Sequence, residues 1–110
     1  MVSKKDRRLS IVVKKKRQAL YQKMAESGCI ACQDSGEKQT TPTEIHHLRQ
    51  GMGMSQRNVK CIPLCVDHHR GNKGYHGIGK KQFEARYGTE QYLLDTWQEL
   101  HGPIDWDEYC

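Results

Sequence analysis

The chain has few hydrophobic residues and no long apolar run. Hydrophobic residues fill 35% of its 110 positions, and the mean hydropathy is −0.89. A single domain of this size has only a small core, so a chain this polar needs a further source of stability, such as a structural metal. No run reaches the length of a membrane span, and Met1 to Lys5 lacks the apolar segment of a signal peptide. We therefore expect a cytoplasmic protein that does not contact a membrane.

The five cysteines are an odd number, which excludes a fully paired set of disulfides within one chain. Four of them, and five of the six histidines, fall between Cys29 and His76. Thiolate and imidazole are the ligands that bind zinc, and imidazole also accepts a proton near neutral pH. The composition of this stretch therefore predicts reduced thiols that bind a metal, together with histidines for a second purpose.

Acidic residues are scarce at the start of the chain and abundant at its end. Residues 1–23 carry nine Lys/Arg against one acid, residues 24–83 eight against five, and residues 84–110 one against seven. A basic arm and a mildly basic centre fit a nucleic-acid partner, although such runs are equally common on solvated surfaces. We expect a basic N-terminal arm or helix over 1–28, a metal-stapled domain over 29–101 and an acidic tail over 102–110.

Apolar residues at helical spacing predict helices at both ends of the chain. The first is an amphipathic basic helix over residues 9–24, with a stop at Ser27 and Gly28. From residue 80 onward two helices follow, separated by Gly88, with Thr89 capping the second. Residues that share one face of the second helix are predicted to lie in the core, namely Leu93, Trp97 and Leu100.

Between these helices the sequence predicts two short strands, a short helix and connecting loops. The strands are expected over 43–48 and 59–64, the helix over 65–73 and the loops over 33–43, 49–58 and around His76. Pro63 places the second strand at a sheet edge or close to its end. The predicted fold class is α+β.

The Cys29-x-x-Cys32 spacing puts two thiolates on one tight turn, the usual half of a tetrahedral zinc site. Cys65 with His68 repeats the two-residue spacing and could supply the second half, whereas Cys61 with Cys65 is the all-cysteine alternative. We favour the first pair, because it leaves Cys61 as a small buried residue of a strand. The predicted structural zinc ligands are Cys29, Cys32, Cys65 and His68.

A closed zinc site has no room for the remaining histidines, His46, His47, His69 and His76. Side chains alternate between the two faces of a strand. His46 and His47 should therefore point to opposite faces, so that one can bind an ion while the other faces a substrate. His69 follows His68 on the predicted helix and can reach a second metal.

Several spaced motifs of the chain occur together: Glu-Ile-His-His-Leu, Gly-Met-Gly, Ile-Pro-Leu-Cys-Val-Asp-His-His-Arg, Gly-Tyr-His-Gly and Phe-Glu-x-x-Tyr-Gly. The order strand, loop, strand, helix, with His-His on the first strand, resembles the ββα-metal motif of HNH endonucleases. More narrowly, residues 29–94 are similar to the phage recombination-enhancement (Ref-type) nucleases. His68 stands where the HNH family commonly has a second cysteine. The resemblance implies that residues 29–101 form a zinc-stapled HNH nuclease domain.

The resemblance also implies roles for the surplus histidines. His47 would be the general base that activates water, and Asn58 would orient it, although an ordinary turn asparagine is the alternative. His46 and His69 would hold one divalent cation such as Mg²⁺ or Mn²⁺. His76 would complete this metal set, with Gly74 and Gly77 giving it freedom to turn inward; a phosphate-contacting or exposed His76 is the alternative.

The implied partners are DNA and a recombinase filament in phage or bacterial recombination. Basic residues expected to contact phosphates are Lys14, Lys15, Lys16, Arg17, Arg49, Arg70 and Lys73. Two other functions remain open: a non-catalytic zinc-binding nucleic-acid module, and an adaptor that docks on a recombinase through its acidic tail. A pure binder needs no unliganded His47 beside a ligand, which favours the nuclease.

Overall fold

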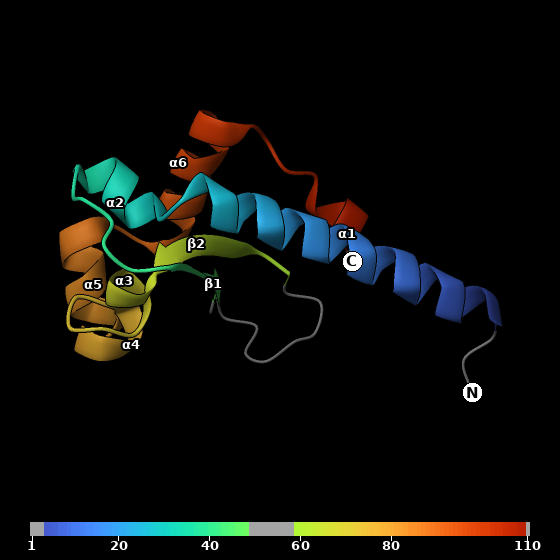
Figure 1. Cartoon of the computed structure of the whole chain (residues 1–110), viewed down its shortest axis with the longest axis horizontal. Helices are drawn as coiled ribbons and strands as arrows, with labels where there is room; N and C mark the ends of the chain where they lie inside the picture. The colour runs from blue at the N-terminus through green and yellow to red at the C-terminus, as the bar shows by residue number, and fades with distance from the viewer. Residues whose placement is uncertain (1–3, 49–58, 110) are drawn as a thin grey trace.

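The computed structural model describes residues 4–48 and 59–109, with side chains from residue 11 onward. In chain order the elements are α1 (Lys4–Ser27), α2 (Ile30–Ser35), β1 (Thr43–His47), β2 (Cys61–Cys65), α3 (Val66–His69), α4 (Tyr75–Ile78), α5 (Lys80–Tyr87), α6 (Glu90–His101) and the 3-10 helix η1 (Trp106–Tyr109) (Figure 1). Helices surround one antiparallel sheet, which confirms the predicted α+β class. No helix in the described part of the chain is long and apolar enough to cross a membrane.

The sheet consists of β1 and β2, followed directly by the short helix α3. His46 lies opposite Ile62 and His47 opposite Cys61. Pro63 sits inside β2, where its missing N–H is tolerated because, among the described residues, β2 pairs with a strand on one edge only. All five residues of β2 are buried, since α1, α2 and α6 pack against it. The strand lies one to two residues later than predicted.

The core is formed where α1, α5 and α6 meet the sheet. Its largest fully buried side chains include Met24 of α1, Phe83 of α5 and Trp97 of α6. Leu93 is also buried, as the helical spacing predicted. Leu100 is 58% exposed, so its prediction as a core residue was wrong. The last turn of α6 extends beyond the elements that pack on the middle of the helix (Figure 1). The helical spacing of apolar residues does not reveal where this packing ends.

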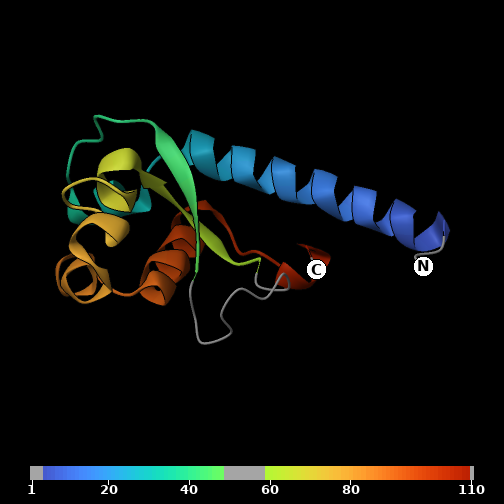
Figure 2. The same ribbon diagram turned by 90° about the horizontal axis from the view of Figure 1, so that it is seen from below.

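Helix α1 is longer than predicted and extends well beyond the rest of the molecule (Figures 1 and 2). Its C-terminal half packs on the sheet through Leu20 and Met24, whereas Ile11 and Val12 in the first half are about half exposed, at 54% and 49%. The C-terminal helix η1 lies against α1, where Nε of Arg17 donates to the Tyr109 carbonyl at 2.6 Å. The molecule is accordingly elongated, at 47 × 26 × 22 Å.

Three short helices stand where turns, loops or a longer helix were predicted. Cys29 caps α2, which occupies the start of the predicted loop 33–43 and ends at Gly36 in a left-handed conformation (φ 78°). Helix α3 covers four residues of the predicted 65–73, and α4 carries His76 in place of a loop. Each of these helices has four to six residues, which is too short for an apolar periodicity to be read from the sequence.

Candidate metal centres

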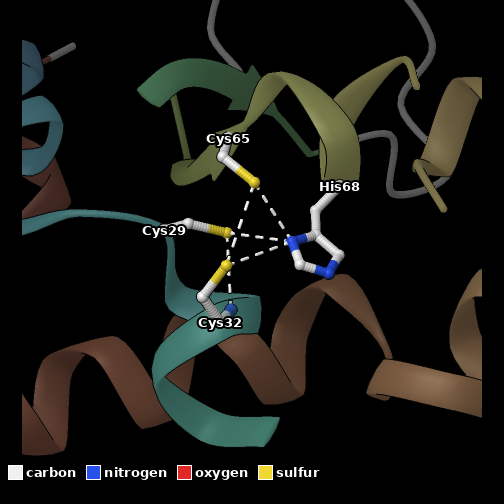
Figure 3. A group of neighbouring side chains, drawn as sticks. All are labelled: Cys29, Cys32, Cys65 and His68. Carbon is white, nitrogen blue, oxygen red and sulfur yellow. Dashed lines mark hydrogen bonds between the residues drawn. The ribbon is translucent and has the colours of Figure 1, made fainter. Parts of the chain in front are cut away.

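The first centre joins the beginning of α2 to the junction of β2 and α3 (Figure 3). Nδ1 of His68 lies 3.5 Å from Sγ of Cys29, 3.3 Å from Sγ of Cys32 and 3.1 Å from Sγ of Cys65. The sulfur atoms of Cys32 and Cys65 are 3.9 Å apart. All four side chains are buried, and their ligand atoms lie within 4.8 Å of one another. Two segments far apart in the sequence are thus brought to one point.

This donor set fits a tetrahedral zinc ion. With Zn–S bonds of about 2.3 Å, tetrahedral geometry places two sulfur atoms roughly 3.8 Å apart, close to the 3.9 Å between Cys32 and Cys65. Burial raises the pKa of the Cys29 and Cys32 thiols, so the protein alone does not stabilise their thiolates. A bound cation provides the compensating charge and displaces the thiol protons. The cluster could therefore hold a metal such as zinc.

The imidazole of His68 is held in the tautomer that a metal ligand needs. Its Nε2 lies 2.6 Å from Oε2 of Glu37, which also accepts hydrogen bonds from the hydroxyl of Tyr87 at 3.3 Å. Because a carboxylate only accepts, Nε2 carries the proton and the lone pair of Nδ1 faces the three sulfur atoms. A carboxylate behind a ligating histidine orients the ring and raises its basicity.

Cys61 lies apart from this cluster. Its thiol is fully buried in β2 and contacts Sδ of Met24 at 3.5 Å. Burial raises the pKa of Cys61 to about 12, so the group remains a neutral thiol. Cys61 packs as a small apolar residue, and the structure gathers the Cys₃His set in place of the all-cysteine alternative.

The second centre consists of His46 from β1, His69 from α3 and His76 from α4. Their ring centroids are 5.2 Å apart for His46 and His69, 5.2 Å for His46 and His76, and 5.0 Å for His69 and His76. One nitrogen from each ring lies within 4.8 Å of the others. His46 is buried, His69 is partly buried and His76 is exposed, so the cluster opens to the surface on the side of α4.

Two carboxylates orient the rings of this second centre. Oε2 of Glu90 lies 2.7 Å from Nε2 of His46, and the hydroxyl of Tyr75 donates to Oε1 of Glu90 at 3.2 Å. Oε1 of Glu44 lies 3.0 Å from Nδ1 of His69. Each carboxylate takes the proton-bearing nitrogen, which leaves Nδ1 of His46 and Nε2 of His69 as the lone-pair atoms. The cluster therefore offers three imidazoles, two of them oriented by carboxylates, and could hold a metal ion.

Close backbone packing, and not flexibility, places His76. A Cβ at Gly74 would lie 2.6 Å from the backbone of His69 and Arg70, and a Cβ at Gly77 would collide with the carbonyl oxygen of Gly71. These glycines let α4 approach α3 more closely than any side chain would allow. The expectation that Gly74 and Gly77 give His76 freedom to turn was therefore wrong, because they fix α4 against α3.

His47 lies on the opposite face of β1 from His46, as strand alternation predicted. Its side chain is exposed whereas that of His46 is buried. Nε2 of His47 lies 3.2 Å from the hydroxyl of Tyr21 on α1. The pKa of His47 is lowered, first by partial burial and then by the charges of His46 and Arg17. At neutral pH the ring is therefore neutral and has a lone pair available.

The basic residues expected to contact DNA fall into different environments. The side chains of Lys14, Lys15 and Lys16 are exposed on α1, and Lys73 is exposed between α3 and α4. Arg17 donates to the carbonyl of Tyr109. Arg70 makes two hydrogen bonds to Glu44, at 3.0 and 3.1 Å, and this pairing lowers the pKa of Glu44. Asn58 and Arg49 lie outside the described residues.

No functional role is predicted from the sequence for the residues that support the two centres and His47. At the centres these are Glu37, Glu44 and Glu90, together with Tyr75 and Tyr87, and at His47 it is Tyr21. Glu44 carries a usable signal, because residues two apart on a strand share a face and Glu44 precedes His46 by two. Glu90 looks like an ordinary acidic residue in the first turn of a helix. Its distance from His46, 44 residues along the chain, hides the contact.

Comparison with known proteins gives one result that covers most of the chain. The model of the family described as recombination enhancement, RecA-dependent nuclease, matches residues 13–101. No curated protein and no solved structure matches. The matched stretch contains both metal centres, His47 and all of the supporting carboxylates.

Proposed function

Because the chain belongs to the recombination enhancement, RecA-dependent nuclease family, we propose that it is a metal-dependent DNA endonuclease of the HNH type. The observation that carries this proposal is the cluster of His46, His69 and His76 beside a neutral His47 on the other face of the same strand. A metal set next to an unliganded base is what phosphodiester hydrolysis requires. The zinc-type cluster supports the fold around this arrangement.

His46, His69 and His76 would hold one divalent cation, such as Mg²⁺ or Mn²⁺. When bound, this ion stabilises negative charge on the scissile phosphate and on the leaving oxygen. The three side chains come from β1, α3 and α4, so the geometry depends on the packing of these elements. Glu90 and Glu44 hold the rings of His46 and His69 in place by hydrogen bonds.

His47 would take a proton from the attacking water. General-base catalysis is most effective when the pKa of the base lies near the working pH, where its lone pair is free and it still accepts a proton well. Burial and the neighbouring charges of His46 and Arg17 lower the pKa of His47 and keep it in this state. Asn58, assigned by resemblance to orient this ring, lies outside the described residues.

DNA would approach along α1 and the exposed side of the second centre. Lys14, Lys15 and Lys16 lie exposed on the projecting helix, where they can contact phosphates without rearrangement of the fold. Such contacts give affinity that depends on salt and not on base sequence. The family description further suggests that cleavage takes place on DNA bound by a RecA filament.

The test is nicking of supercoiled plasmid with Mg²⁺ or Mn²⁺, in the presence and absence of a RecA filament. His47→Ala is compared with the wild type and with the control His101→Ala. His101 hydrogen-bonds Gln33 and packs on Trp97, and it is a member of neither cluster. Zinc content and DNA affinity are measured on the same preparations.

We expect wild type and His101→Ala to cut and His47→Ala to lose at least about a hundredfold in rate, because general-base catalysis contributes roughly 10²–10⁴. All three proteins should retain zinc and bind DNA equally. Absence of cleavage by the wild type under every condition would favour a non-catalytic zinc module. Equal cleavage by His47→Ala would remove His47 from the mechanism.

A further inference from the structure

Helix α1 places a tyrosine against the proposed base. The hydroxyl of Tyr21 lies 3.2 Å from Nε2 of His47, and the two rings meet edge to face, with centroids 5.5 Å apart at 82°. Within the described part of the chain, no other hydrogen bond to His47 is present. The contact joins residues 26 positions apart, so it depends on how α1 docks on β1.

The position of Tyr21 is fixed by packing. Leu20 and Met24 of the same helix are buried in the core, and Tyr21 itself is partly buried against that core. Burial also raises the pKa of Tyr21, so its hydroxyl stays protonated. A hydroxyl on a rigid helix is a better orienting group than one on a mobile loop, because little freedom is lost when the hydrogen bond forms.

A neutral imidazole has one N–H and one lone pair, and a catalytic base is commonly oriented by a third group. We propose that Tyr21 is a positioning residue for His47, whose Nε2–H donates to the Tyr21 hydroxyl while Nδ1 takes the proton from water. This inference rests on the proposed function, since it assigns the supporting group of the same base. Helix α1 would then complete the active site in addition to contacting DNA.

The geometry explains why the nitrogen facing Tyr21 is not the base. An Nε2 that is hydrogen-bonded to a half-buried hydroxyl has no direction left for a water molecule. Rotating the imidazole by half a turn about its Cβ–Cγ bond would put Cε1 in the place of Nε2 and lose the hydrogen bond. Tyr21 therefore fixes the orientation of the ring, and when its hydroxyl accepts from Nε2–H, Nδ1 is the nitrogen with the lone pair.

The experiment compares Tyr21→Phe with Tyr92→Phe. The first change removes the hydroxyl and keeps the ring contact with His47. The second removes a hydroxyl that donates to Asp34 at 3.0–3.1 Å, a contact between α6 and α2 that involves neither Tyr21 nor His47. Single-turnover cleavage with Mn²⁺, DNA affinity by fluorescence anisotropy and thermal melting are measured for each. The tautomer of His47 is read from ¹⁵N NMR of histidine-labelled protein, with His47→Ala to assign the signal.

We expect Tyr21→Phe to cut about tenfold more slowly, a part of the roughly 10²–10⁴ supplied by a general base. Its DNA affinity and melting temperature should match those of wild type, and Tyr92→Phe should behave as wild type throughout. The NMR signal should show the Nε2–H tautomer in wild type and lose that preference in Tyr21→Phe.

An unchanged or faster rate for Tyr21→Phe would overturn the proposal, since a faster rate would mean that the hydroxyl blocks the base. A wild-type ring protonated on Nδ1 would overturn it as well. If the wild type does not cut DNA at all, the proposed function fails, and the NMR result alone then decides whether Tyr21 sets the tautomer of His47.

Discussion

At the scale of single residues, the recurring feature is a histidine with a carboxylate behind it. The three pairs are His46 with Glu90, His68 with Glu37 and His69 with Glu44, at 2.7, 2.6 and 3.0 Å. In each pair the carboxylate accepts from one ring nitrogen and leaves the lone pair of the other for a cation. The same device serves the Cys₃His cluster and the histidine cluster, so the chemical difference between the centres comes from the other ligands. These are three buried thiols at the first centre, and a second carboxylate-backed imidazole together with His76 at the other.

The separation of Cys61 from the Cys₃His cluster leads to a prediction on zinc content. Cys65→Ala removes one of the four gathered ligands, so it should lose zinc and unfold at a lower temperature. Cys61→Ala removes only a buried thiol in contact with Met24. This variant should keep one zinc per structural site. The small cavity that it leaves should lower the free energy of unfolding by about 1 kcal/mol or slightly more.

Metal analysis of the purified variants and thermal melting check this prediction. Cys110 lies outside the described residues. Cys110→Ala serves as a control for the removal of a thiol elsewhere in the chain. Loss of zinc from Cys61→Ala together with its retention in Cys65→Ala would show that the cluster is assembled differently in solution.

The residue types of both centres could be predicted from the sequence, but their supports could not. The two-residue spacing of Cys29 with Cys32 and of Cys65 with His68 reflects local geometry that a chain segment carries by itself. Strand alternation likewise separates His46 from His47. Glu90 reaches His46 only because α6 packs on the sheet, and no local pattern encodes that contact.

At the scale of elements, the second centre depends on the contact between α3 and α4. The spacing Gly71, Gly74, Gly77 lets the two short helices touch backbone to backbone. This contact brings the rings of His69 and His76 to a centroid distance of 5.0 Å. The close contact between α3 and α4 therefore sets the positions of His69 and His76 relative to each other.

Gly77→Ala tests this role. The added Cβ would collide with the carbonyl oxygen of Gly71, so α4 must move and carry His76 away from His69. We expect Mn²⁺ affinity, measured by calorimetry or electron paramagnetic resonance, to fall by about tenfold or more, in the range seen when outer-shell support of a metal is lost. Zinc content should not change, because none of the Cys₃His ligands lies on α4, and only His68 lies on α3.

Asn72→Ala, an exposed substitution in the same segment, is the matched control and should bind Mn²⁺ as wild type does. Equal Mn²⁺ affinity of Gly77→Ala and wild type would mean that His76 does not contribute to the site.

The long helices and both strands were predictable, whereas α2 and α4 were not predicted and α3 is shorter than the helix expected there. Helix α1 has many turns of basic and apolar periodicity, and α6 begins at Thr89, whose side chain accepts from the backbone N–H of Tyr92 as a cap should. Helices α2, α3 and α4 contain one or two turns each. Their formation depends on packing and close glycine contacts, which act between segments and leave no period in the sequence.

At the scale of the whole molecule, the basic charge is concentrated on the helix that projects from the rest of the fold. The most basic segment of the chain forms the projecting helix α1. The acidic C-terminal segment folds back against the middle of that helix, where Arg17 donates to the carbonyl of Tyr109. Lys14, Lys15 and Lys16 are exposed on α1, and of these Lys16 lies beside Asp105 and Glu108. A polyanion can therefore approach α1 at Lys14 and Lys15.

The triple variant Lys14→Ala, Lys15→Ala, Lys16→Ala should weaken DNA binding in a salt-dependent way. If each lysine neutralises one phosphate, the slope of log affinity against log salt should become shallower by up to about 3. Fluorescence anisotropy over a range of salt concentrations gives this slope. The melting temperature should not change, because all three side chains are exposed.

A control of equal charge, Lys38→Ala, Lys80→Ala, Lys81→Ala, removes three exposed lysines from other parts of the surface. Its slope should stay close to that of wild type. Equal changes in the two triple variants would indicate that net charge, and not the projecting helix, determines the affinity.

The adjacent positions of His68 and His69 on α3 restrict how the length of this helix can change. One belongs to the Cys₃His cluster and the next to the histidine cluster. A single peptide unit therefore carries a ligand of each centre, and an inserted or deleted residue in α3 would move both at once. A change in the length of α3 would therefore disturb both centres together, whereas a substitution of a ligand that lies outside α3, such as Cys29 or His76, affects one centre alone.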